Sequence, residues 1–216
     1  MFWRGVVGYL PVNIIQGLVG LATIVTFTRL LTPAQFGDYA LGFSAMSLLH
    51  TAIFTWNEAA MARFWVGEAD KGRGGDHSAT IYRTWLALLV VLPVALAIAL
   101  LLPLSPGLKL AVVCGVLAVL PRTFAKLAQE RRRAAGEVAG AASIDMIQTL
   151  GAFGVGAIFA WQGFGGAAPL IGFGVAAAVC MAWTLPSELR HSRQGRFESP
   201  RVRTYLGYGL PVAMSL

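Results

Sequence analysis

Charged residues are scarce in this 216-residue sequence: they make up only 12%, whereas hydrophobic residues make up 56%. Soluble domains carry roughly a quarter charged residues, so the composition excludes an ordinary soluble protein. Three runs contain no charge at all and are long enough to cross a hydrocarbon layer of roughly 30 Å. They span residues 5–28, 84–108 and 146–187. The sequence therefore predicts an all-α integral membrane protein.

Residues that bind metals or carry out catalysis are also few. The two cysteines, Cys114 and Cys180, lie inside apolar runs, which favours helix packing over a disulfide or a metal pair. The histidines, His50, His77 and His191, are scattered, so no metal site is expected. No P-loop, dinucleotide fingerprint or nucleophile elbow occurs. We therefore expect no catalytic residues and no cofactor, and any transport would draw on an ion gradient or the membrane potential.

The apolar runs divide into six membrane-spanning helices and the start of a seventh. We expect the six at about residues 6–31, 37–64, 80–102, 108–130, 138–161 and 167–187. This predicts three parts: a transmembrane bundle over residues 1–187, a basic cytoplasmic linker over 188–203, and a truncated seventh helix over 204–216. Because the sequence ends inside that last apolar run, we expect it to be a fragment of a longer protein.

The basic residues predict how these helices are oriented. If the N-terminus is cytoplasmic, all but two of the 17 Lys and Arg residues fall in cytoplasmic segments, and the exceptions are Arg29 and Lys109. The net charge of +7 then reflects membrane topology, and we expect no nucleic-acid partner. Even the basic cluster "QERRR" at residues 129–133 is expected to face anionic lipid headgroups.

The connection between the first two expected helices has a defined sequence, "RLLTPAQFGDYAL", at residues 29–41. Arg29 suits the carboxyl end of a helix dipole. Thr32, Pro33 and Gln35 form a capping-box pattern with proline at the first helical position. The pattern predicts a tight, capped hairpin between the two helices.

This passage resembles a pattern that follows the first helix in the polysaccharide-transporter family of bacterial oligosaccharide flippases. That family belongs to the multidrug/oligosaccharidyl-lipid/polysaccharide exporter superfamily, together with multidrug extruders and lipid II flippases. Arg63, in "MARFWVGEADKGRG", is similar to an arginine that closes the family's second helix. Residues 127–150 resemble the family's basic link between helices 4 and 5. The matching positions in the first passage are Arg29, Leu30, Leu31, Pro33, Phe36, Gly37, Tyr39, Ala40 and Leu41.

The resemblance implies one half of a two-lobed flippase, the N-terminal one, with the substrate passing between the lobes. The implied function is to flip polyprenyl-diphosphate-linked oligosaccharide across the bacterial inner membrane by alternating access, in polysaccharide or lipopolysaccharide biosynthesis. The implied partners are membrane lipids and the lipid-linked oligosaccharide, with an envelope glycan polymerase or glycosyltransferases as further candidates. Two alternatives stay open: a cation-coupled multidrug antiporter of the same superfamily, and a membrane-embedded enzyme or non-transporting assembly factor of envelope synthesis.

Charges at membrane depth are costly, so they are candidate functional residues. Arg122 lies about 13 Å along its helix from Arg131, and Asp145 lies about 12 Å from Glu137, at 1.5 Å per residue. We therefore expect Arg122 and Asp145 to approach each other or to share an aqueous cavity, with Lys126 on the Arg122 face. Arg122 and Lys126 are the candidate contacts for a lipid diphosphate, and Asp145 is the candidate ion-coupling residue. The alternative is that Arg122 and Asp145 only neutralise each other.

Two further sets of polar residues have less specific interpretations. Asn13 and Gln16 share a helix face with two glycines, so they either allow close packing or line a substrate cavity. Glu58 and Arg63 stand among aromatic residues and are expected to anchor the chain at the membrane interface.

Overall fold

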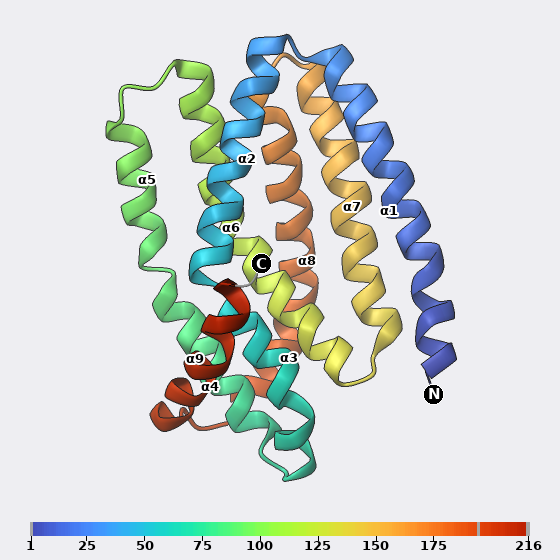
Figure 1. Ribbon diagram of the computed structural model, residues 1–216, viewed down its shortest axis with the longest axis vertical. Helices are drawn as coiled ribbons and strands as arrows, with labels where there is room; N and C mark the ends of the chain where they lie inside the picture. The colour runs from blue at the N-terminus through green and yellow to red at the C-terminus, as the bar shows by residue number, and fades with distance from the viewer. Residues whose placement is uncertain (1, 194, 215–216) are drawn as a thin grey trace.

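The computed structural model describes residues 2–193 and 195–214, with side chains over residues 12–193 and 195–213. The described residues form helices and connecting turns without strands, so the all-α prediction is confirmed (Figure 1). The Arg4 side chain and the last two residues of the expected seventh helix lie outside the described part. The helices are α1 (Phe2–Leu30), α2 (Pro33–Ile53), α3 (Thr55–Asp70), α4 (Gly74–Leu88), α5 (Val91–Leu101), α6 (Pro106–Ala134), α7 (Val138–Trp161), the 3₁₀ helix η1 (Gly165–Ala167), α8 (Ala168–Arg193) and α9 (Ser199–Met214).

Among the described residues, five helical segments are long and apolar enough to cross a membrane. The segment expected at residues 37–64 is not one of them. It is interrupted at Phe54, between α2 and α3, and its polar residues Asn57 and Glu58 are buried within the protein. The count of six spans and the cytoplasmic N-terminus therefore stay predictions. The five segments are residues 12–30, 74–101, 106–134, 138–161 and 165–193.

Several helix ends differ from the expected ones. The segment expected at 80–102 begins at Gly74 and is divided into α4 and α5. The seventh helix begins at Ser199, and α8 continues to Arg193, through much of the expected linker. The reason is that Glu188 is only 1% exposed and forms ion pairs inside the bundle, which keeps this part of the chain helical. The division of the chain into a bundle, a linker and a seventh helix stays a prediction, and the connection between α8 and α9 is shorter than the expected linker.

The hairpin between α1 and α2 has the predicted cap. The Thr32 hydroxyl accepts a hydrogen bond from the Gln35 backbone N–H (3.3 Å), and the Gln35 side chain accepts one from the Thr32 N–H (3.0 Å). Pro33 begins α2, and Arg29 lies in the last turn of α1. The connection therefore needs only two residues between the helices.

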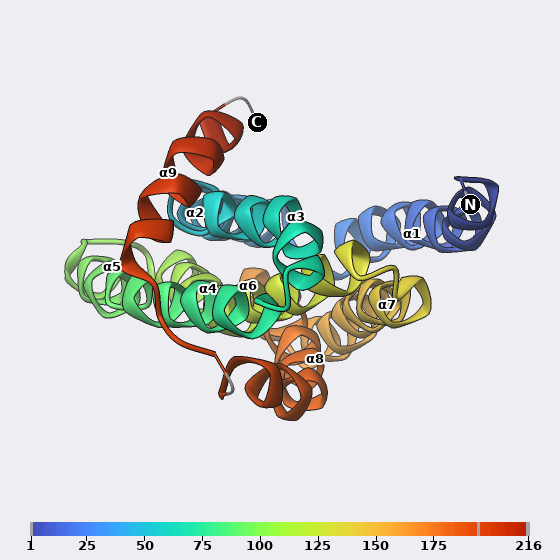
Figure 2. The same ribbon diagram turned by 90° about the horizontal axis from the view of Figure 1, so that it is seen from below.

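The central helix is α6, which contacts α2, α3, α5, α7 and α8 (Figure 2).

Small residues allow two of these helices, α7 and α8, to pack closely against each other. A Cβ atom added to Gly172 of α8 would overlap the Ala152 carbonyl oxygen and lie 2.6 Å from the Gly156 nitrogen, both in α7. The large side chains that remain exposed on α1 and α5 are mostly Leu, Ile and Val, as a lipid-facing surface requires.

Gly172→Ala should destabilise the protein by about 1–3 kcal/mol, because the new methyl group meets backbone atoms that cannot rotate away. Gly154→Ala is the matched control: Gly154 lies in α7 with nothing within 4 Å of its added Cβ, so it should be neutral or stabilising by up to about 1 kcal/mol. Unfolding in mixed detergent micelles, followed by circular dichroism, measures both. Equal stability of the two variants would contradict the α7–α8 packing.

Candidate functional site

A polar pocket of about 210 Å³ lies between α2, α6, α7 and α8. It contains both of the charged residues predicted to share a cavity, Arg122 and Asp145. The candidate diphosphate contact Lys126 lies in the same wall. The other lining residues are His50, Gln129, Gln148, Thr149 and Phe173.

Arg122 is the residue that gives this pocket its positive charge. It lies on α6 directly after Pro121, and its guanidinium is 5.6 Å from the centre of the Phe173 ring on α8. No Asp or Glu among the described residues forms an ion pair with it; Glu58, which is bound to His50, acts on its charge only from beyond 4.0 Å. A cation at membrane depth is normally paired or lies in a wet cavity. Arg122 therefore remains available for an anionic ligand.

Lys126 lies one turn further along α6 and is partly neutralised. Its ammonium donates a hydrogen bond to the Gln129 side-chain oxygen (3.0 Å) and lies 3.7 Å from a Glu130 oxygen. These contacts hold the Lys126 side chain along its own helix, next to Arg122. A ligand that binds Arg122 would therefore compete with Glu130 for Lys126.

Asp145 does not pair with Arg122. Its Oδ2 accepts a hydrogen bond from Arg133 (2.7 Å), a residue at the end of α6. Mutual neutralisation of Arg122 and Asp145 is therefore wrong as an interpretation, whereas the shared pocket is present. The roles assigned to Arg122, Lys126 and Asp145 in substrate and ion binding stay predictions.

Asn13 and Gln16 occupy different environments. Gln16 lines a second pocket of about 310 Å³ between α1, α7 and α8, which shares Thr149 and Phe173 with the polar pocket. Asn13 is exposed and lines neither of these two pockets. The geometry thus places Gln16 next to the candidate site and Asn13 away from it.

His50 and Glu58 form a buried pair beside the polar pocket. His50 Nε2 lies 2.8 Å from Glu58 Oε1, across the helix interruption at Phe54. The prediction that Glu58 anchors the chain at the interface is wrong, because this residue is only 7% exposed; Arg63 is exposed. Within the described residues no group of three His, Cys, Asp or Glu side chains is arranged to hold a metal, and both cysteines are free.

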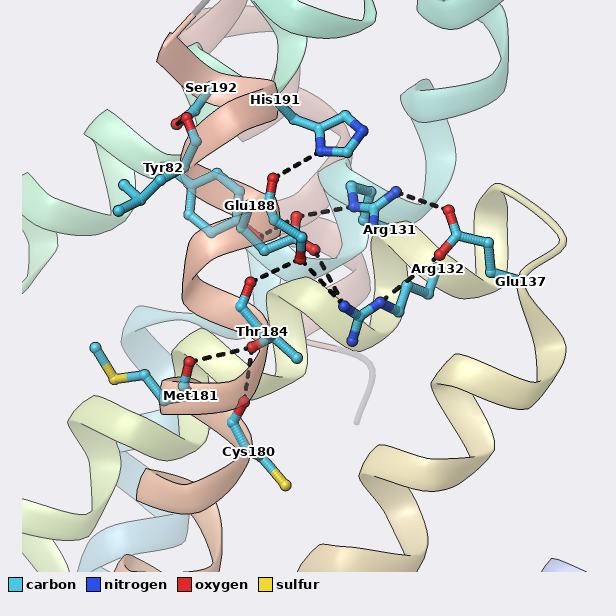
Figure 3. Close-up of polar contacts among 12 residues, drawn as sticks. Tyr82, Arg131, Arg132, Glu137, Cys180, Met181, Thr184, Glu188, His191 and Ser192 are labelled. Carbon is cyan, nitrogen blue, oxygen red and sulfur yellow. Dashed lines mark hydrogen bonds and ion pairs between the residues drawn. The ribbon is translucent and has the colours of Figure 1, made fainter.

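A second charged cluster joins α4, α6 and α8, and Figure 3 shows its contacts. Glu188 of α8 accepts a hydrogen bond from Arg131 of α6 (2.8 Å) and another from the Tyr82 hydroxyl of α4 (3.0 Å). Arg132 lies 4.0 Å from the other Glu188 oxygen. Glu137, before α7, contacts both arginines at 3.1 and 3.7 Å.

This cluster corrects the interpretation of residues 129–133. Arg131 and Arg132 are 2% and 8% exposed, so they do not face lipid headgroups. Each guanidinium also lies against an aromatic ring, that of Trp65 for Arg131 and that of Trp183 for Arg132. Glu188 was missed because the sequence placed it in a solvated linker. The available signal for its burial in an ion pair was its position two to five residues before Arg190, His191 and Arg193, at the end of α8.

Glu188→Gln should destabilise the protein by about 3–5 kcal/mol, because it leaves two buried arginines without their main counter-charge. The control is Glu137→Gln, which also removes a carboxylate that contacts Arg131 and Arg132. Because the Glu137 side chain is half-exposed, this change should cost less than about 1 kcal/mol. Detergent unfolding curves for the two variants would measure the difference. A Glu188 variant as stable as the Glu137 variant would contradict the buried network.

Comparison with known proteins identifies the family. Residues 2–123, more than half of the chain, match the model of a family described as polysaccharide biosynthesis protein. The matched region extends from α1 to α6 and includes Arg122, but it ends before Lys126 and Asp145. No curated protein and no solved structure matches the chain. The chain therefore belongs to the polysaccharide biosynthesis protein family, as a membrane protein with several spanning helices.

Proposed function

We propose that this chain forms part of a flippase that moves polyprenyl-diphosphate-linked oligosaccharide across the bacterial inner membrane by alternating access. In this proposal Arg122 binds the diphosphate, and Lys126 joins it after leaving Glu130. The observation that carries the proposal is the lack of an ion pair at Arg122 within the described residues, in a polar pocket at membrane depth. The family, which is one of polysaccharide biosynthesis, supports this substrate class.

The charge balance of the pocket favours an anionic headgroup over a cationic drug. Arg122 and Lys126 line the pocket, while its one carboxylate, Asp145, is already bound to Arg133. A cation entering the pocket would have to displace Arg133 and approach Arg122. A diphosphate meets opposite charge there, and in the low dielectric of a membrane protein this attraction is stronger than in water.

The size of the pocket indicates which part of the substrate it would hold. A volume of about 210 Å³ fits a small headgroup, not an oligosaccharide. The glycan would therefore lie outside the pocket and the prenyl chain along an apolar surface. The adjoining pocket between α1, α7 and α8 offers the polar side chains of Gln16, Thr23 and Thr149 along this route.

Arg122→Gln should raise the Kd for a polyprenyl diphosphate about tenfold to a hundredfold, since a hydrogen bond to a charged group contributes about 1.5–3 kcal/mol. Quenching of the intrinsic tryptophan fluorescence of the purified chain measures the binding, with the uncharged polyprenol as a ligand control. Arg190→Gln, which removes the same charge from an exposed position, should leave the Kd unchanged. Equal affinity of Arg122→Gln and the unmodified chain would refute the diphosphate site.

Asp145 remains the candidate ion-coupling residue. Protonating its carboxylate would remove one of the acidic partners of Arg133, another being Glu130, and this gives a direct link between ion binding and the pocket wall. Asp145→Asn should therefore abolish the dependence of flipping on a proton or sodium gradient in proteoliposomes. Its Kd for the polyprenyl diphosphate should change less than about twofold, because Arg122 is intact. Gradient-dependent flipping by Asp145→Asn would assign coupling to another group.

A further inference from the structure

A crevice of about 280 Å³ lies between α4 and α8, apart from the polar pocket. The two cavities have no lining residue in common. Most of the crevice wall is apolar, which suits a hydrocarbon chain better than a soluble metabolite. The apolar lining residues are Ala79, Trp85, Leu86, Phe124, Met181, Leu185 and Leu189.

Two arginines, Arg83 of α4 and Arg193 of α8, also line this crevice. Both are exposed, and neither has an ion pair or a side-chain hydrogen bond with any residue in the described part of the chain. The one carboxylate in the wall, Glu188, is neutralised by Arg131 and Arg132. The crevice therefore combines apolar walls with two cations that no protein group neutralises.

The position of Arg83 along its helix indicates where the crevice meets the membrane. Arg83 precedes Leu101, the last residue of α5, by about 27 Å at 1.5 Å per residue. This distance is close to the thickness of the hydrocarbon layer, so Arg83 lies near a headgroup region. Leu86, Val90 and Val94 follow it on the same face of the helix and are all more than half exposed. Arg83 thus stands where a lipid-facing apolar stripe ends.

Arg83 also borders a second groove, on the other side of α4. This groove has a volume of about 420 Å³ and is lined by Thr84, Ala87, Phe197 and Val202 besides Arg83. An amphiphile with two hydrocarbon chains and its charged group at Arg83 would find an apolar wall on either side of α4. A phospholipid has this form, with one charged headgroup and two hydrocarbon chains.

We propose that the crevice between α4 and α8 binds one anionic phospholipid of the surrounding bilayer. Its phosphate contacts Arg83 and Arg193, and an acyl chain lies against Leu86 and Leu185. A free phosphate would leave the apolar wall unused, and a zwitterionic headgroup would bring a positive charge to the two arginines. Because Tyr82 and Glu188 also line the crevice, the bound lipid stabilises the contact of α4 with α8. This inference is independent of the proposed transport activity.

Native mass spectrometry of the full chain in detergent tests the proposal, with phosphatidylglycerol and phosphatidylcholine of identical acyl chains as probes. The first phosphatidylglycerol should bind at least about fivefold more tightly than phosphatidylcholine, since each surface arginine contributes about 1 kcal/mol toward an anionic lipid. Arg83→Gln combined with Arg193→Gln should remove this preference. Both side chains are exposed, so the double variant should keep its circular dichroism spectrum.

Two further variants separate a built site from general surface charge. Arg190→Gln removes an exposed arginine of α8 that does not line the crevice, and it should keep the preference. Leu86→Asp should weaken binding of both lipids, because it places a charge in the apolar wall. The proposal is overturned if the double arginine variant retains the preference, if Arg190→Gln loses it equally, or if Leu86→Asp binds both lipids normally. Displacement of the lipid by excess glycerol phosphate would also overturn it.

Discussion

The carboxylate of Glu188 must be neutralised inside the bundle, and this requirement joins three helices. Its oxygens contact Tyr82 of α4 and the two arginines Arg131 and Arg132 of α6. Leaving either sign of charge unpaired in this environment would cost several kcal/mol. The helices are therefore held in one relative arrangement at this end of the bundle. The other end is held by short capped turns and close glycine contacts, which are weaker constraints individually.

Against this background, Arg122 differs from the four cations that follow it on α6. Lys126, Arg131, Arg132 and Arg133 each have a carboxylate within 4.0 Å, whereas Arg122 has a phenylalanine ring and an open pocket. Within the described part of the chain, every cation of this helix from Lys126 onward is thus paired with a carboxylate, and Arg122 is not. In the proposed function an anion supplied by the substrate is the counter-charge, and it would be present only when the substrate is bound.

Much of the fold could be predicted because hydrophobic length and capping are local properties. The α1–α2 hairpin follows from Thr32 and Gln35 alone, and the shared pocket of Arg122 and Asp145 follows from their equal depth. The burial of Glu58 and Glu188 could not be predicted in this way. Glu58 meets His50 across the helix interruption at Phe54, which the sequence pattern does not mark. For Glu188 the paired arginines lie more than 50 residues away.

Helical geometry explains why the basic cluster misled the sequence interpretation. Consecutive residues of a helix point about 100° apart, since there are 3.6 residues per turn. Three consecutive arginines therefore cannot all lie on one face of the helix. Arg131 and Arg132 point toward Glu188 of α8, and Arg133 points toward Asp145 of α7. Spacings of three and four residues are the informative ones: Arg122, Lys126 and Gln129 follow them along the pocket wall. Arg133 continues the same series beyond Gln129 and pairs with Asp145, which also lines the pocket. Rotational position thus separates Arg131 and Arg132, which pair with Glu188, from the side of α6 that lines the pocket. On that side Arg122 differs from Lys126 and Arg133 because it has no carboxylate within 4.0 Å among the described residues.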